Sequence, residues 1–218
     1  MKNYKLPTRK QCFEIIADHH VPLRVLRHSL TAAKIAVFLA KRLIEKGIEV
    51  DIDLLEKACL LHDIARVCDF KEMDYRCFNQ TVTDEDKAVW QQLREKYNDL
   101  FHEDAAYEIL KDDFPELASL VRKHKYMGML DEENKPSTWE EKLIFYADMR
   151  VMHDKIAPLK ERLKEGHKRN IHLHGSEEQS RLNTAKVDPL IMELENEIFE
   201  IIDLDPLDIT DEFINTYQ

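Results

Sequence analysis

Only four glycines occur in 218 residues, and this scarcity constrains the fold more than any other feature of the chain. Glycine is a poor helix former, so a chain nearly free of it, and rich in Leu, Ile, Ala, Glu and Lys, favours helices over a sandwich, a barrel or a Rossmann sheet. The sequence therefore predicts an all-α protein, a single helical bundle with a helical C-terminal extension. Each glycine is expected between helices, at Gly47, Gly128, Gly166 and Gly175.

Apolar residues at helical spacing predict the main helices. Pro22 opens a long helix that ends at Gly47. This helix is apolar on two sides, which indicates a central place in the bundle with His28 pointing inward. A second helix is expected from Asp53, as its N-cap, to about Ala65. Further helices are expected over 7–18, from near His102, from Pro115 to His124, from Ser137 or Thr138 through Met152, over 187–202, and in a short stretch near the end.

Two regions lack this periodicity. Residues 69–99 are charged and aromatic, and we expect a partly helical insertion whose aromatic rings cap the core rather than stack on a base. Residues 164–184 are polar and are expected to form a loop. The predicted division is thus a helical core, 1–152, with an N-terminal helix and the 69–99 insertion, and a C-terminal extension, 153–218, packed on it. The helix over 187–202 either covers the core or forms a homodimer contact.

The net charge of −11 limits the partners of the chain. An acidic chain repels polyanions, so duplex nucleic acid is not an expected partner. A small phosphorylated ligand is compatible with this charge, because a metal and a few local arginines outweigh a distant acidic tail. No stretch reaches the roughly 18 apolar residues of a membrane span, and the four cysteines show no CxxC spacing. We therefore expect a cytoplasmic protein with reduced thiols and no membrane contact.

Six side chains that can bind a metal lie on apolar helical stripes. The clearest are His62 and Asp63, which end the apolar run from Ala58 to Leu61. A buried carboxylate costs several kcal/mol unless it is paired, protonated or bound to a cation. A lone histidine on such a stripe is more often a hydrogen-bonded core residue, but this set recurs on several helices and indicates a shared divalent metal. The six residues are His28, His62, Asp63, His102, His124 and Asp148.

The order of these residues resembles the HD superfamily of metal-dependent phosphohydrolases. The resemblance covers about residues 20–152 and rests on three motifs, around His28, at His62-Asp63 and at Asp148. His102 and His124 match the two extra histidines of the subset that holds two metals, which includes HD-type dinucleoside polyphosphate hydrolases. Where many members have glycine after His-Asp-Ile, this chain has Ala65.

The resemblance implies a role for each ligand. His28, His62, Asp63 and Asp148 would bind a first metal, and Asp63 would bridge to a second one held by His102 and His124. A carboxylate has two oxygens and can bridge two ions, and water between them becomes a hydroxide nucleophile near neutral pH. The mixed nitrogen and oxygen donors suit two divalent transition ions, Fe, Mn, Co, Ni or Zn, better than Mg²⁺.

Three cationic residues are candidates for substrate binding. Arg66 follows the His-Asp motif, and its planar guanidinium suits a phosphate clamp that acts with Asp63 in catalysis; the alternative is a surface arginine at a helix C-terminus. Arg27 precedes His28, and Lys125 follows His124. Both are candidates to attract an anionic substrate; the alternative for both is a solvated helix face that needs no function, which is favoured for Arg27.

Three hypotheses follow. The first is an enzyme, a metal-dependent phosphohydrolase that uses a metal-bridging hydroxide on a small phosphate ester or a nucleotide-like phosphoanhydride. The second is a non-catalytic HD module that binds metal and nucleotide as a sensor. The third is a helical interaction protein with satisfied core polar groups. The complete set of six ligands argues against the third hypothesis and less strongly against the second.

Overall fold

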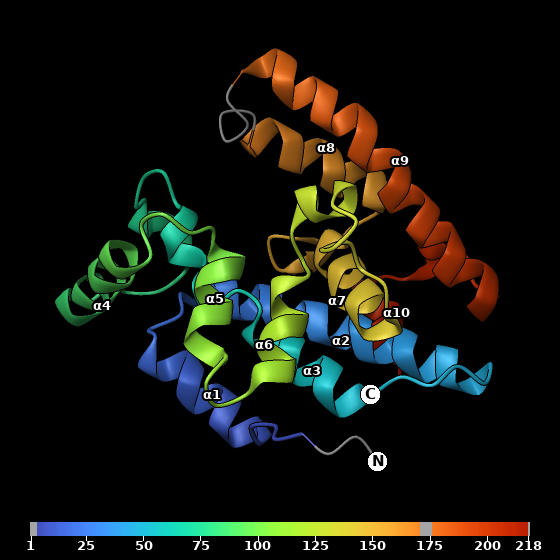
Figure 1. Cartoon of the computed structure of the whole chain (residues 1–218), viewed down its shortest axis with the longest axis horizontal. Helices are drawn as coiled ribbons and strands as arrows, with labels where there is room; N and C mark the ends of the chain where they lie inside the picture. Colours follow the sequence, from blue (N-terminus) through green and yellow to red (C-terminus); the bar gives the residue numbers. More distant parts are fainter. Residues whose placement is uncertain (1–3, 171–175, 218) are drawn as a thin grey trace.

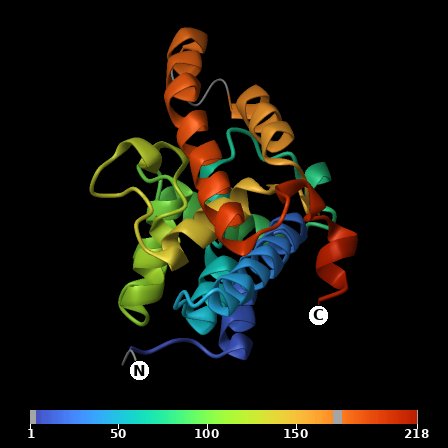
Figure 2. The same ribbon diagram turned by 90° about the vertical axis from the view of Figure 1, so that its right-hand side faces the viewer.

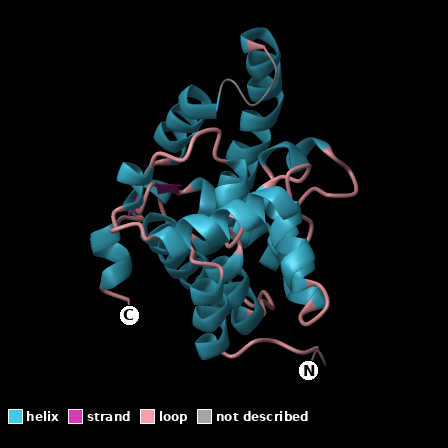
Figure 3. Cartoon of the chain, turned by 90° about the vertical axis from the view of Figure 1, so that its left-hand side faces the viewer, coloured by secondary structure: helices cyan, strands magenta, loops and turns pink. Residues whose placement is uncertain are grey.

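In the computed structural model, which describes residues 4–170 and 176–217, the protein consists of helices and one two-stranded antiparallel hairpin (Figure 1, Figure 3). The predicted all-α class is confirmed. In order the elements are α1 (Arg9–Asp18), α2 (Leu23–Glu45), α3 (Ile52–Leu61), η1 (Arg66–Asp69), η2 (Tyr75–Phe78), α4 (Asp84–Lys96), α5 (His102–Leu110), α6 (Pro115–Arg122), η3 (Tyr126–Leu130), α7 (Trp139–Met149), β1 (Val151–Met152), β2 (Lys155–Ile156), α8 (Leu159–Asn170), α9 (Glu177–Ile202), η4 (Pro206–Asp208) and α10 (Asp211–Asn215).

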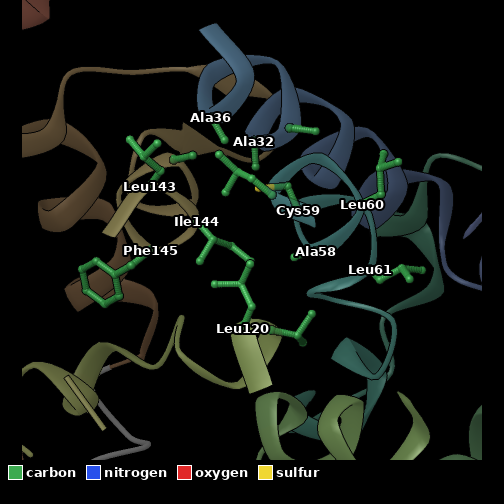
Figure 4. Close-up of a cluster of buried hydrophobic side chains, with 14 of the residues drawn as sticks. Ala32, Ala36, Ala58, Cys59, Leu60, Leu61, Leu120, Leu143, Ile144 and Phe145 are labelled. Atoms are coloured by element: carbon green, nitrogen blue, oxygen red, sulfur yellow. The ribbon is translucent and has the colours of Figure 1, made fainter. Parts of the chain in front are cut away.

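Helix α2 lies at the centre of the bundle and packs against α3, α7 and α9. Small residues at its contact with α3, including Ala32 and Ala36 on α2 and Ala58 on α3, are buried and let the two helices approach closely. Leu120 of α6 and Ile144 of α7 fill the space below them (Figure 4). The predicted central position of this helix, with two apolar sides, is confirmed. Pro22 is its N-cap rather than its first residue.

Helix α3 begins and ends earlier than predicted. Its N-cap is Asp51, whose side chain accepts a hydrogen bond from the Leu54 N–H, whereas Asp53 lies inside the helix and pairs with Lys57 at 2.6 Å. The helix ends at Leu61, not Ala65. The chain then forms tight turns, in which the backbone N–H of one residue donates to the carbonyl three residues earlier, and continues into η1. His62 and Asp63 therefore lie on a tight turn at the end of a buried helix.

Helix α7 confirms the expected start but not the expected end. Thr138 and Glu141 form the predicted capping box. The helix stops at Met149 instead of Met152, because the chain turns into the β1–β2 hairpin, with His153 at its tip in a left-handed conformation, φ 64°. The buried side chain of Arg150 holds this turn by donating to the carbonyl of Ala157 and to two carbonyls near η4. Arg150 therefore has a structural role.

The 69–99 region is partly helical, as expected. Its helix α4 packs against η1, and η2 packs against α2 (Figure 1). Trp90 is 1% exposed and donates its indole N–H to the carbonyl of His20 at 2.7 Å, and Phe78 and Tyr97 are also buried. These three rings therefore cap the core, as we favoured, whereas Tyr75 lies more exposed beside Trp90.

The C-terminal part departs most from prediction. Residues 164–184 were expected as a loop, but α8 extends through Asn170, and α9 begins at Glu177, ten residues before the expected start at 187. Periodicity missed these turns because they bury few apolar side chains. Gly166 lies inside α8, against expectation. Residues 171–175, Gly175 included, fall outside the described residues.

Figure 2 shows α9 running from the tip of the molecule down onto the bundle, where it contacts α2, α7 and η3. This chain therefore uses the predicted helix 187–202 as cover for its core. The short C-terminal turn and helix that we expected are η4 and α10. None of the described helices combines the length and the apolar character that crossing a membrane requires.

Candidate metal centre

The six predicted ligands lie on or directly after five helices and meet in one place. They lie on α2, directly after α3, at the start of α5, just after α6 and near the end of α7. All but His28 are buried, and the His28 side chain is 12% exposed. We call these residues the donor cluster: His28, His62, Asp63, His102, His124 and Asp148.

Asp63 divides the donor cluster into two groups. Its Oδ2 faces the first group, lying 3.9 Å from Nε2 of His28 and 3.7 Å from Nε2 of His62. Oδ1 of Asp148 completes this group, 2.7 Å from His28 Nε2 and 3.7 Å from His62 Nε2. The first group therefore gathers two imidazole nitrogens and two carboxylate oxygens.

The other carboxylate oxygen of Asp63 faces the second group. Oδ1 lies 3.0 Å from Nε2 of His102 and 3.9 Å from Nε2 of His124. The two Nε2 atoms are themselves 3.0 Å apart. His28, His62 and Asp63 in the first group, and Asp63, His102 and His124 in the second, each bring one donor atom within 4.8 Å of the others, close enough to hold a cation. The two triads share Asp63, and Asp148 joins the first through its contacts with His28 and His62.

The four histidines of the donor cluster are oriented in the same way. The Nδ1 of His28, His62 and His124 lies 3.1, 2.7 and 2.5 Å from a backbone carbonyl oxygen, of His153, Cys59 and Val121 respectively. A carbonyl only accepts, so each Nδ1 donates its proton there and each Nε2 faces the centre, where it can offer a lone pair to a cation once it is deprotonated. His102 is fixed likewise, with Nδ1 against the Asp69 carboxylate. This arrangement is typical of histidines that bind metals.

One atom tests whether a metal fits. Nε2 of His62 is buried and has no hydrogen-bond partner among the described residues. A buried polar atom without a partner costs about 1–3 kcal/mol, and a cation in the first group would remove this penalty. The donor set of imidazole nitrogens and carboxylate oxygens therefore fits a divalent transition ion.

The charges around the two groups differ. Burial opposes ionisation of Asp63, but His62, Arg66 and His102 outweigh it and hold the pKa of that carboxyl well below its usual range. Burial also opposes protonation of His102, yet Glu103 and the hydrogen bonds to Asp63 and Asp69 raise its pKa to about 10.

His124 behaves in the opposite way. Burial and repulsion from His62 and His102 lower the pKa of His124 to about 3. A cation entering the second group therefore meets one neutral imidazole and must displace a proton from the other, His102.

Arg66 lies against the second group. Its Nη1 is 3.0 Å from both ring nitrogens of His102 and 3.7 Å from Oδ2 of Asp69. Burial opposes its charge, but Asp63, Asp69 and Glu103 raise the pKa of the guanidinium. A permanent cation thus stands beside the shared carboxylate, where the sequence predicted a phosphate clamp.

The structure does not bring the other two predicted substrate-binding residues to the donor cluster. Arg27 lies about 100° around α2 from His28, so it faces away from the donor cluster. It is exposed and makes no hydrogen bond or ion pair within the described chain. Lys125 pairs with Asp104 and lies over the Phe101 ring, 5.7 Å from its centroid. Their roles in substrate binding stay predictions.

Sequence reasoning missed two residues that contact the donor cluster directly. Asp69 places Oδ2 against His102 Nδ1 and accepts the backbone N–H of His102 at 2.9 Å, so it also caps α5. Glu103 Oε2 lies 3.3 Å from the same Nδ1. Asp69 and His102 are 33 residues apart, and nothing in either local sequence reports the contact. Together these three form a further group with cation-binding potential.

The comparison with known families agrees with this geometry. The HD domain family matches residues 25–152, more than half of the chain. The protein therefore belongs to the HD domain family, a superfamily of metal-dependent phosphohydrolases, as the motifs predicted.

A curated relative is the tRNA (cytidine(56)-2'-O)-methyltransferase of Picrophilus torridus, 26% identical over 181 residues. The match covers 77% of this chain but only 43% of that protein, so the chain spans less than half the length of this relative. No solved structure matches the chain.

Proposed function

We propose that this protein is a dinuclear metal-dependent phosphohydrolase acting on a small phosphate ester or a phosphoanhydride. The observation that carries the proposal is the orientation of Asp63, whose two oxygens face different pairs of imidazole nitrogens. A core carboxylate that only needed a partner would be satisfied by one of them. A carboxylate with a pair of donors on each side is the arrangement that bridges two ions roughly 3.5–4 Å apart.

The residues assign the metal sites as follows. His28, His62 and Asp148 would hold one ion, His102 and His124 the other, and Asp63 both. Bound divalent ions lower the pKa of a coordinated water to near neutrality and take up negative charge that develops on a phosphoryl group. Fe, Mn, Co, Ni and Zn all suit such a donor set.

Arg66 supplies the remaining charge. Its guanidinium lies beside the second group, within reach of an anion that approaches Asp63. Two parallel N–H donors can hold two oxygens of a phosphoryl group and orient it toward the shared carboxylate. Arg66 would therefore bind the substrate and stabilise the charge that builds up during attack.

We propose a small phosphorylated substrate, with nucleotides as the leading class, rather than duplex nucleic acid. The chain carries a net charge of −11, which repels a long polyanion. The relative from Picrophilus torridus is named for an RNA-modifying activity, but less than half of that protein aligns with this chain. The methyltransferase activity of that protein is therefore not proposed for this chain. The division of the chain at residue 152 and a cytoplasmic location stay predictions.

The alternative is a non-catalytic HD module that binds metal and nucleotide as a sensor. Turnover of an aryl phosphate separates the two functions. The protein would be purified, loaded in turn with Mn, Fe, Co, Ni and Zn, and compared with Asp63→Ala and with the control Asp99→Ala, an exposed carboxylate outside the donor cluster.

We expect hydrolysis by the loaded protein and by Asp99→Ala, and a loss of about 10³-fold or more in Asp63→Ala, the scale seen when a group central to catalysis is removed. Nucleotide and metal binding without turnover under every metal would establish the sensor instead. Undiminished turnover in Asp63→Ala would remove this carboxylate from the mechanism.

A further inference from the structure

A second positively charged region adjoins the first metal group. Arg24 lies on α2, one turn before His28, and its guanidinium contacts Nδ1 of His153 at the hairpin tip. The carbonyl of His153 in turn accepts from His28 Nδ1 at 3.1 Å. Two arginines of α8, Arg162 and Arg169, act on the same His153 electrostatically. We call Arg24, Arg162 and Arg169 the arginine cluster.

The arginine cluster carries more positive charge than its neighbours balance. In the described chain, Glu165 is the carboxylate nearest to the two arginines of α8, 3.8 Å from Nη1 of Arg162 and 3.7 Å from Nη1 of Arg169, too far for a hydrogen bond to either. Oε2 of Glu165 is buried and has no hydrogen-bond partner in the described chain. Among the described residues, Arg162 and Arg169 thus share one carboxylate that is poorly placed for both, and Arg24 forms no ion pair.

Burial and neighbouring cations both disfavour the charge of Arg169. Burial and the neighbouring Arg162 lower the pKa of its guanidinium to about 10, and Arg66 and Arg24 add to the effect. Arginine normally titrates far above this range. The charges of Arg24 on α2, Arg66 after α3 and Arg162 on α8 therefore all act on Arg169. The arginine cluster is thus within electrostatic range of Arg66, which lies beside the donor cluster.

A structural role explains only part of the arginine cluster. Arg162 donates its Nε–H to the carbonyl of Val151 at 2.6 Å, which fastens α8 to β1, and its guanidinium lies across Gly166, where a Cβ would meet Nη1 at 2.7 Å. Arg169 makes no hydrogen bond within the described residues, and its only acidic neighbour is Glu165. An anion bound between these guanidiniums would balance their charge.

We propose that the arginine cluster binds a second phosphoryl group of the substrate, next to the one held at the donor cluster. This inference rests on the proposed function and narrows its substrate to phosphoanhydrides with at least two phosphates. A phosphate monoester carries about two negative charges, which the metal site and Arg66 already match. Planar guanidiniums further along the same face fit the oxygens of the next phosphate.

The test compares one phosphate with two. Binding of inorganic phosphate and of methylenediphosphonate, a non-hydrolysable diphosphate, would be measured by calorimetry on the full metal-loaded chain. The variants are Arg169→Gln and Arg24→Gln. The matched control is Lys168→Gln, which removes one charge from the neighbouring exposed position of α8. Circular dichroism and metal content verify that each variant is folded and loaded.

We expect the protein to bind the diphosphonate at least about 10-fold more tightly than phosphate. Each arginine variant should lose most of this preference, as expected for one charge-assisted pair, while its affinity for phosphate changes less than about twofold. Lys168→Gln should keep the preference. Arg169→Lys, which retains the charge but not the planar guanidinium, should keep part of the preference for the diphosphonate. If Arg169→Gln does not fold, the result for Arg24→Gln alone tests the proposal.

Three results would overturn the inference: no preference in the unmodified protein, an unchanged preference in both arginine variants, or an equal loss in Lys168→Gln. Aryl phosphate turnover on the same preparations keeps the two proposals apart. Turnover of the aryl phosphate without a preference for the diphosphonate would refute the second phosphate site but support the proposed hydrolase. A preference for the diphosphonate that depends on Arg169 and Arg24, without turnover under any metal, would refute the proposed hydrolase but support an anion-binding site.

Discussion

The donor cluster and the arginine cluster are built by different means. The ligands of the donor cluster are fixed twice, by apolar helices that bury them and by a carbonyl or carboxylate on each Nδ1. The arginine cluster lies largely on α8, a polar helix, and its Arg169 has no hydrogen-bond partner among the described residues. The rigid region suits chemistry that needs fixed geometry, and the less constrained region suits recognition of a charged group.

The largest effect should come from removing one ligand of the second group. His124→Ala should lower the metal content from two ions per chain to one and reduce turnover by about 10³-fold, because His102 and one oxygen of Asp63 alone hold an ion weakly. Metal analysis after gel filtration measures the first effect and aryl phosphate assays the second. His19→Ala, a histidine outside the donor cluster, is the control. Two tightly held ions in His124→Ala would show that the second group is not a metal site.

A smaller effect is expected from the residue that orients a ligand. Asp69→Asn keeps the size of the side chain but weakens its hold on His102 Nδ1. Metal affinity of the second group should fall about 10–100-fold, while that of the first group stays constant, which metal titration against a chelator resolves. Equal weakening of both groups would indicate general damage to the fold rather than loss of orientation.

The affinity of the second group for its metal ion should change about 10-fold per pH unit. His102 has a pKa raised to about 10 in the metal-free protein, so at pH 7 it is protonated, and a metal must displace that proton. Affinity for the second ion should therefore rise with pH between pH 6 and 8, with release of about one proton. Calorimetry in buffers of different ionisation enthalpy measures this proton. An affinity independent of pH would show that His102 is not a ligand.

The smallest effect should come from a substitution beside the arginine cluster. Gly166→Ala adds a better helix former to α8, worth up to about 1 kcal/mol, but its Cβ displaces the Arg162 guanidinium. The melting temperature should stay constant or rise slightly, the metal content should remain at two, and the diphosphonate preference should fall about threefold. A loss of metal in this variant would mean that the two clusters are not separable.

The features that could be predicted from the sequence are those linked to a local pattern of buried apolar residues. His62 and Asp63 could be found because polar residues that end an apolar run need a partner, and His28 because it lies on a stripe of a helix apolar on two sides. The capping box at Thr138 and Glu141 also obeyed local rules. These features depend on residues close together in the chain, where periodicity and capping act.

Features that depend on distant contacts could not be predicted. Asp69 meets His102 across 33 residues, and no local pattern reports that contact. Arg169 was assigned to a loop because α8 has no strong apolar stripe, and so the arginine cluster stayed hidden. The end of α7 was misplaced because Val151 continues the helical spacing, whereas the hydrogen bonds of the Arg150 side chain turn the chain into a hairpin.

Whether Asp63 bridges two ions is decided by the metal content of the protein. After reconstitution with an excess of a single transition metal and gel filtration, we expect close to two ions per chain, and anomalous diffraction should place them roughly 3.5–4 Å apart on either side of Asp63. One ion or fewer, with no gain on reconstitution, would contradict it.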